Sequence, residues 1–128
     1  YKIKRGVLLR MVDFSEMFIT VNGTSFFHGV KPFQIGSILK LVKDPENLHD
    51  GEAIKVLMRY AGQVGFVANS PKTVAKGAMS AGRIYDKIMN PDYAKVRFIF
   101  KDTILAQILS QEELEQEKSD ENSDVNKI

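Results

Sequence analysis

Apolar and polar residues alternate along five short stretches of the chain, a period of two that is typical of β-strands with one buried face. The five stretches are residues 17–22, 37–42, 53–59, 63–68 and 93–101. Residues 103–109 fit either a last strand or a short helix. If each strand turns one face inward, the alternation places Ile54, Val56, Val64, Phe98 and Phe100 in the core.

Turn-forming residues separate these stretches. Asn22-Gly23 lies between residues 17–22 and a second apolar run at 24–30. This dipeptide favours a tight hairpin, because both of its residues tolerate positive φ. Ala61-Gly62 lies between two of the strands in the same way, so we expect a second hairpin there. Residues 43–52 are rich in Pro, Asn, Asp and Gly and predict a loop.

The pattern changes after residue 69. Ser70-Pro71 is a typical helix start, because serine caps the first turn and proline needs no N–H at the first helical position. Apolar residues between 74 and 79 supply a buried stripe, and Gly77 and Gly82 weaken the helix. We therefore expect a helix with a bend near 80–82 that resumes over 83–89. Residues 1–16 fit either a short helix or an edge strand.

Six or seven short strands, with one or two helices after the second hairpin, predict an α+β domain. A small, partly open β-barrel covered by a helix is a natural way to close so many short strands. The 128 residues have room for one domain with its own core. We assign residues 17–110 to that domain, residues 1–16 to an N-terminal extension and residues 111–128 to a tail.

The charge is divided unevenly along the chain. Residues 1–110 carry 16 lysines and arginines against 9 acidic residues, a net charge of +7, whereas residues 111–128 carry 2 against 7, a net charge of −5. The tail has few apolar residues, so we expect it to be largely disordered, although residues 111–118 could extend the domain as a short helix. The basic body favours an anionic partner, of which nucleic acid is the commonest.

Several classes of function lack the residues they need. The chain has no cysteine and two histidines, which excludes disulfide scaffolds, thiolate metal sites and cysteine nucleophiles. The loop carboxylates, of Asp44, Glu46, Asp50 and Glu52, lack the spacing of a calcium-binding loop. The sequence contains no phosphate-binding glycine loop or nucleophile motif. We therefore expect a non-enzyme without metal or cofactor, and, since no membrane span or signal peptide is apparent, a cytoplasmic one.

The central part of the chain resembles a known family. Residues 29–33 read G-V-K-P-F, residues 41–56 read L-V-K-D-P-E-N-L-H-D-G-E-A-I-K-V, and residues 64–67 read V-G-F-V. This order of motifs resembles the HIRAN domain, which occurs both as a stand-alone bacterial protein and at the N-terminus of helicase-like transcription factor. The resemblance implies a barrel related to oligonucleotide-binding (OB) folds and a pocket for single-stranded DNA or for DNA ends. In the transcription factor, that pocket captures a free 3′-hydroxyl.

The resemblance also implies a set of binding residues. Asn47 and Asp50 match residues that line the family's pocket, and Asp50 would accept a hydrogen bond from a terminal sugar hydroxyl. Other positions differ from the family pattern: Lys31 replaces an arginine, Pro32 and His49 replace base-stacking aromatics, Phe66 replaces a histidine and Asn69 replaces a lysine. The candidate nucleic-acid-binding residues are Lys31, Phe33, Asn47, His49, Asp50, Phe66, Asn69 and Lys72.

Each candidate also has a structural interpretation. Asn47 and Asp50 suit a turn as well as a ligand contact, Phe33 fits the core better than a pocket, and Lys72 fits a solvated surface charge. Two functions follow. The first is a non-catalytic module that binds nucleic acid, alongside an ATPase or nuclease partner protein. The second is a protein-interaction or regulatory domain that keeps the fold without the pocket, its acidic tail serving as a docking segment or occupying the basic groove.

Overall fold

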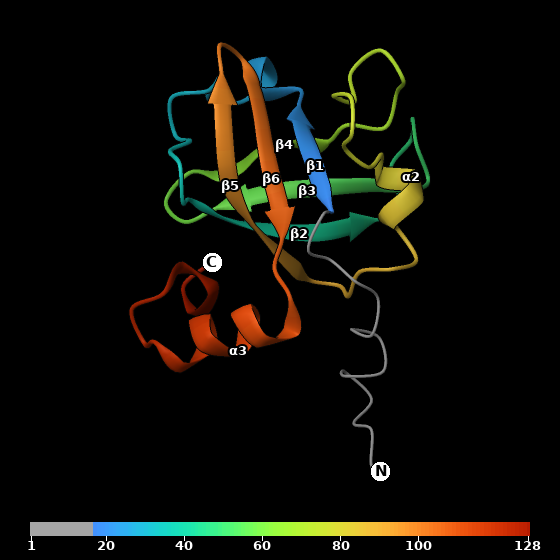
Figure 1. Cartoon of the computed structure of the whole chain (residues 1–128). Helices are drawn as coiled ribbons and strands as arrows, with labels where there is room; N and C mark the ends of the chain where they lie inside the picture. The colour runs from blue at the N-terminus through green and yellow to red at the C-terminus, as the bar shows by residue number, and fades with distance from the viewer. Residues whose placement is uncertain (1–16) are drawn as a thin grey trace.

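The computed structural model describes residues 17–128, in which six antiparallel strands form a closed barrel (Figure 1). The order of strands around the barrel is β1-β4-β3-β2-β5-β6. Their bounds are β1 Phe18–Asn22, β2 Ile38–Asp44, β3 Ala53–Met58, β4 Gly62–Val67, β5 Asp92–Phe100 and β6 Thr103–Ile108. The helical elements are η1 Thr24–Phe26, α2 Ala81–Ile84, α3 Gln111–Ser119 and η2 Asp124–Asn126. The expected fold class is confirmed, with the barrel closed rather than partly open.

Strand β1 closes the barrel because it pairs on both sides. It pairs with β6 along four residues and with β4 at Val21–Val67 and Asn22–Phe66. The prediction of a hairpin at Asn22-Gly23 was therefore wrong. Gly23 does adopt positive φ (71°), but the chain then enters the 3₁₀ turn η1 and a series of turns over residues 27–30. The second expected hairpin is present, since β3 pairs with β4.

The core fills the barrel. Ile54, Val56 and Val64 are fully buried, as the alternation predicts. Phe98 and Phe100 were expected beside them, but they are 58% and 71% exposed. A bulge between Val96 and Phe98 adds one residue to β5, and this reverses the inward and outward positions beyond it. Phe98 instead contacts Phe18 on the outer surface, with ring centroids 6.2 Å apart.

Residues 70–79 form turns rather than the first part of the expected helix, and in place of the second part, expected over 83–89, there is one short helix, Ala81–Ile84. Ser70 caps one turn only, and the chain is then held to β1, because the Ala75 N–H donates to Thr20 Oγ1 at 3.0 Å. Gly77 has φ of 88° and directs the backbone out of any helix. The α-helix α2 begins after Ser80, whose side chain caps the Arg83 N–H. In the described part of the chain, no helix has the length and apolar character needed to cross a bilayer.

The C-terminal segment is ordered, contrary to the expectation of disorder. Its first part forms a helix, which agrees with the alternative expectation for residues 111–118. Ser110 and Glu113 form a capping box at the start of α3. Leu114 and Val125 are buried in a satellite cluster with Ile38, Tyr93 and Leu109. The acidic composition hides these few apolar residues, which fix the segment beneath β2 and β5 (Figure 1). The expectation for residues 1–16 lies outside the described residues.

Candidate nucleic-acid interface

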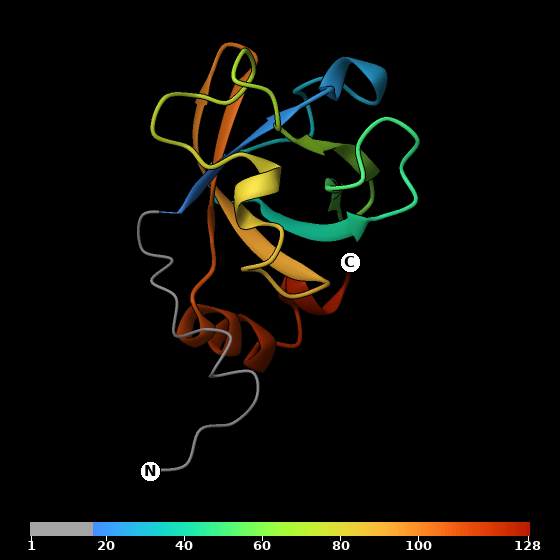
Figure 2. The same cartoon turned by 90° about the vertical axis from the view of Figure 1, so that its right-hand side faces the viewer.

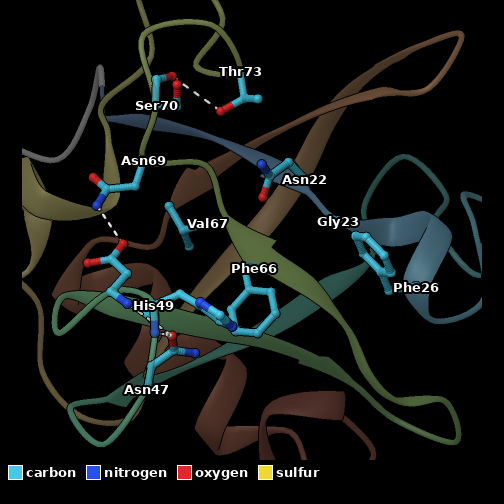
Figure 3. Close-up of a pocket in the computed structure, with 12 residues that line it drawn as sticks. Asn22, Gly23, Phe26, Asn47, His49, Phe66, Val67, Asn69, Ser70 and Thr73 are labelled. Atoms are coloured by element: carbon cyan, nitrogen blue, oxygen red, sulfur yellow. Dashed lines mark hydrogen bonds between the residues drawn. The ribbon is translucent and has the colours of Figure 1, made fainter.

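A cavity of about 490 Å³ opens where β4, the loop after β2 and η1 meet. Figure 2 shows that this loop and η1 project on the same side of the barrel. Figure 3 shows the side chains that line the cavity, which come from segments far apart in sequence. The lining residues are Asn22, Gly23, Phe26, Asn47, His49, Asp50, Ala53, Phe66, Val67, Asn69, Ser70 and Thr73. Because it lies at the open end of the β3–β4 hairpin, we call this cavity the end pocket.

Asn47 shapes the loop on one side of the end pocket. Its Oδ1 accepts hydrogen bonds from the backbone N–H groups of His49 (2.9 Å) and Asp50 (3.1 Å). Its Nδ2 donates to Asp44 Oδ2 at 3.2 Å. These bonds are typical of an Asx turn, so the turn-forming interpretation of Asn47 holds alongside its place in the lining. The effect is to fix the backbone from which His49 and Asp50 project.

The carboxylate of Asp50 is held at both oxygens. Oδ1 accepts from the Glu52 N–H at 2.9 Å, and Oδ2 accepts from Asn69 Nδ2 at 2.7 Å. Asn69 Oδ1 in turn accepts from the Gly82 N–H at 2.7 Å. Since both ends of the Asn69 amide are engaged, its orientation is set, and it connects the loop to α2. Each Asp50 oxygen retains a second lone pair, so the half-buried carboxylate can still accept from a ligand.

Three aromatic rings line the same cavity as this carboxylate. Phe26 is 85% exposed on η1, and His49 is exposed on the opposite loop (Figure 3). Phe66 is half-buried between them and contacts Phe27, with ring centroids 6.2 Å apart. Lys55 is directly opposite Phe66 in the pairing of β3 with β4. Because paired residues project from the same face of a sheet, the Lys55 side chain lies on the same outer face as Phe66.

The structure brings five of the eight sequence candidates together. Asn47, His49, Asp50, Phe66 and Asn69 all line the end pocket. The other three lie elsewhere. Phe33 is 5% exposed and belongs to the barrel core, in agreement with its structural interpretation.

Both remaining candidates are lysines beside other cavities. Lys31 lies beside a separate cavity at the β3–β4 turn. Lys72 lines a third cavity of about 530 Å³, which shares Asn22, Gly23 and Thr73 with the end pocket. The C-terminal segment contributes no lining residue to the end pocket, so in this structure it does not occupy that cavity.

Phe26 is the main lining residue that the sequence analysis missed. The run at 24–30 was expected to form the second strand of a hairpin. The 3₁₀ turn exposes Phe26 almost completely. The sequence does show an aromatic pair, Phe26-Phe27, shortly after Asn22-Gly23. That a turn rather than a strand follows Gly23 is evident only from the pairing of β1 with β4 and β6.

The described residues hold no metal-binding cluster. Among residues 17–128, no three His, Asp or Glu side chains are grouped so that they could bind an ion. The end pocket therefore offers rings, one fixed carboxylate, amides and a lysine nearby. Such a set can stack flat groups and exchange hydrogen bonds with hydroxyls.

Comparison with known proteins agrees with this fold. A family profile described as the HIRAN domain matches residues 14–109. The crystal structure of the HIRAN domain of human HLTF is similar, with a TM-score of 0.52 and 22% sequence identity over 76% of this chain and 78% of that chain. No curated protein matches the sequence. Because the HIRAN profile covers well over half of its length, the chain belongs to the HIRAN domain family.

Proposed function

We propose that this protein is a non-catalytic module that binds the ends of single-stranded DNA. Membership of the HIRAN family supports nucleic-acid binding as the general activity. The observation that carries the finer proposal is the position of the Asp50 carboxylate. It is fixed at both oxygens and lies in the same open cavity as the exposed rings of Phe26 and His49.

The rings account for affinity without requiring a particular base. Every base presents a flat face, so Phe26 and His49 can each stack on an unpaired base. In duplex DNA the bases are already stacked and paired, whereas a terminal unpaired base can enter the cavity at little cost. Lys55, on the same outer face as Phe66, supplies a positive charge for a backbone phosphate.

The carboxylate accounts for selection of the end. A carboxylate accepts hydrogen bonds from hydroxyl groups and repels phosphate groups. Asp50 therefore favours a strand that ends in a free hydroxyl over one that ends in a phosphate. Because Asn69 and Glu52 restrain the carboxylate, it is already oriented when the ligand arrives, which lowers the entropy lost on binding.

The test is fluorescence anisotropy with a labelled single strand of about 10 nucleotides that ends in either a 3′-hydroxyl or a 3′-phosphate. We expect tighter binding of the hydroxyl strand by the wild type. Asp50→Asn removes the charge but keeps the size, and we expect it to bind the two strands equally. Glu121→Gln is the matched control, since it removes one exposed charge from the C-terminal segment. Equal binding of both strands by the wild type would refute end selection.

A second function is favoured by one observation, the exposed aromatic pair Phe98 and Phe100 on the β5–β6 hairpin. Exposed apolar patches mark interaction sites for other proteins, such as a partner ATPase or nuclease. On this alternative the domain recruits a partner and does not bind DNA. Absence of DNA binding at low salt, where electrostatic attraction is strongest, would favour it over the first proposal.

A further inference from the structure

A second cluster of cations and aromatic surface lies at the β3–β4 turn, away from the end pocket. A cavity of about 540 Å³ there is lined by His28, Lys31, Pro32, Met58, Arg59, Tyr60 and Ala61. Tyr60 is 91% exposed, and the Arg59 guanidinium lies 4.5 Å from the centre of its ring. We call Lys31, Arg59 and Tyr60 the turn cluster.

Packing does not explain the position of Tyr60. Its φ is 71°, in the left-handed region that disfavours residues other than glycine and asparagine, and its ring is in solvent. A bulky residue at such a position, with its ring held against an arginine, presents a flat face beside a positive charge. The turn is also tied to the segment after η1, because His28 Nε2 lies 3.0 Å from the carbonyl oxygen of Ala61.

The turn cluster lies at the β3–β4 turn, and the end pocket lies at the opposite end of these two strands. Figure 1 shows the course of β3 and β4 between the two ends. Phe66 lines the pocket and Ala61 lines the cavity at the turn, and five residues of extended chain span about 16 Å. The segment from Phe26 to Lys31 runs between the same two places. Lys55 and the contact between Phe27 and Phe66 lie along this path.

We propose that the turn cluster is a second contact for the single strand whose end occupies the end pocket. The proposal rests on the proposed function. Lys31 is already a binding candidate through the family resemblance. The new contacts are Arg59, which would neutralise a backbone phosphate, and the Tyr60 ring, which would stack on a base several nucleotides from the end. Single-strand sites on OB-type barrels extend over about 4–16 nucleotides, which is more than the end pocket alone would hold. Continuity with the pocket and the exposed ring favour a nucleic-acid strand over an acidic peptide.

Arg59 already has an anionic partner in the chain. Its Nη1 lies 3.4 Å from Asp124 Oδ1 of η2, and both side chains are partly exposed to solvent. A phosphate at the turn cluster therefore competes with Asp124 for the guanidinium. Removing the carboxylate should strengthen binding of a long strand, whereas removing the guanidinium should weaken it. These opposite signs separate a direct contact from general destabilisation, because either variant breaks the same ion pair.

The experiment compares two strands with 3′-hydroxyl ends, one of about 3 nucleotides and one of about 12, by anisotropy at several salt concentrations. For Arg59→Gln and Tyr60→Asn we expect about three- to tenfold weaker binding of the long strand and unchanged binding of the short one. Asparagine tolerates the backbone of residue 60. Arg59→Gln should also reduce the salt slope for the long strand by about 0.7.

Asp124→Asn should bind the long strand more tightly, and the control Glu121→Gln should bind it like the wild type. If these variants bind the long strand as the wild type does, the turn cluster makes no contact and the inference is wrong, while the proposed function stands. If the wild type binds neither strand, the proposed function itself fails. Binding of the long strand that is weakened equally by Asp124→Asn and Arg59→Gln would point to loss of the ion pair, and would also overturn the inference.

Discussion

Asn69 donates to Asp50 Oδ2 at 2.7 Å while accepting from the Gly82 N–H, so one amide fixes the carboxylate of the end pocket to the start of α2. Asn69 was expected to contact DNA, and it lines the pocket, but both of its polar atoms already have protein partners. We therefore regard Asn69 as a positioning residue for Asp50.

Replacing Asn69 by alanine should loosen the carboxylate. We expect Asn69→Ala to lower the free energy of unfolding by about 1–2 kcal/mol and to reduce the preference for a hydroxyl end over a phosphate end. Asn126→Ala is a matched control, because the Asn126 amide also makes two hydrogen bonds, to carbonyl oxygens of the C-terminal segment. Urea unfolding and anisotropy on both variants test this. A loss of stability with the preference intact would show that Asn69 does not position Asp50.

Substitutions at Phe26 and Phe33 should separate effects on DNA binding from effects on the stability of the fold. Phe26→Ala removes a ring that is in solvent, so we expect an unchanged melting temperature and a loss of about 1–3 kcal/mol in DNA binding. Phe33→Ala removes a ring from the core, so we expect a loss of about 3–5 kcal/mol in stability. Phe33→Leu, which is milder, should retain DNA binding. Normal binding by Phe26→Ala would remove this ring from the site.

Gly65 is required by the close approach of β1 to β4. A Cβ at this position would lie 2.6 Å from the carbonyl oxygen of Asn22 and 2.9 Å from Cγ1 of Val21. We expect Gly65→Ala to destabilise the barrel by about 1–3 kcal/mol, because backbone has to shift. Gly51→Ala is the control, since nothing lies within 4 Å of its Cβ and its φ is not positive. Thermal unfolding of both variants checks this, and equal melting temperatures would contradict it.

The stability of the domain should fall at alkaline pH. Burial, together with the charge of Asp92, raises the pKa of Tyr93 above its ordinary value of 10.0. The unfolded chain therefore releases this proton near pH 10 while the folded chain retains it, so the free energy of unfolding decreases as the pH rises from about 10 toward the folded pKa. Below pH 10 this contribution is fully present.

Urea unfolding of the wild type and Tyr93→Phe at about pH 8 and pH 10.5 measures this effect. We expect the wild type to lose more stability than Tyr93→Phe between the two values. Tyr60→Phe is the control, because the Tyr60 ring is in solvent. An equal loss in the wild type and Tyr93→Phe would rule out Tyr93 as a source of the alkaline instability.

Local pattern predicted most of the barrel. Alternation located five of the six strands within a few residues, because each has one face in the core, and it left residues 103–109, which form β6, open between a strand and a helix. It failed at Phe98 and Phe100, where an inserted residue in β5 depends on the pairing with β6 and leaves no local signal. For the tail, composition concealed the burial of Leu114 and Val125, so only the alternative expectation of a short helix over 111–118 agrees with the structure.

The resemblance to the HIRAN family, rather than local pattern, named the pocket residues that one continuous segment supplies. Asn47, His49 and Asp50 lie in a single loop whose turn residues were recognised in the sequence. Phe26 was missed, and Lys31 lies beside a different cavity from the other candidates, because the path of residues 23–33 depends on strands far away in sequence. Local pattern identified the loop over residues 43–52, but it could not show that the Phe26 ring lies across the cavity from that loop.

The two residue pairs that join β1 to β4 form a short seam, and the end pocket lies directly over it. Asn22, Phe66 and Val67 belong both to this seam and to the pocket wall. A ligand that contacts residues from both strands acts as a clamp across the place where the closed barrel has least backbone pairing. Occupancy of the pocket should therefore suppress local opening of the barrel, and hydrogen exchange at the Ala68 amide, which bonds Thr20 across the same seam, would report the bound state.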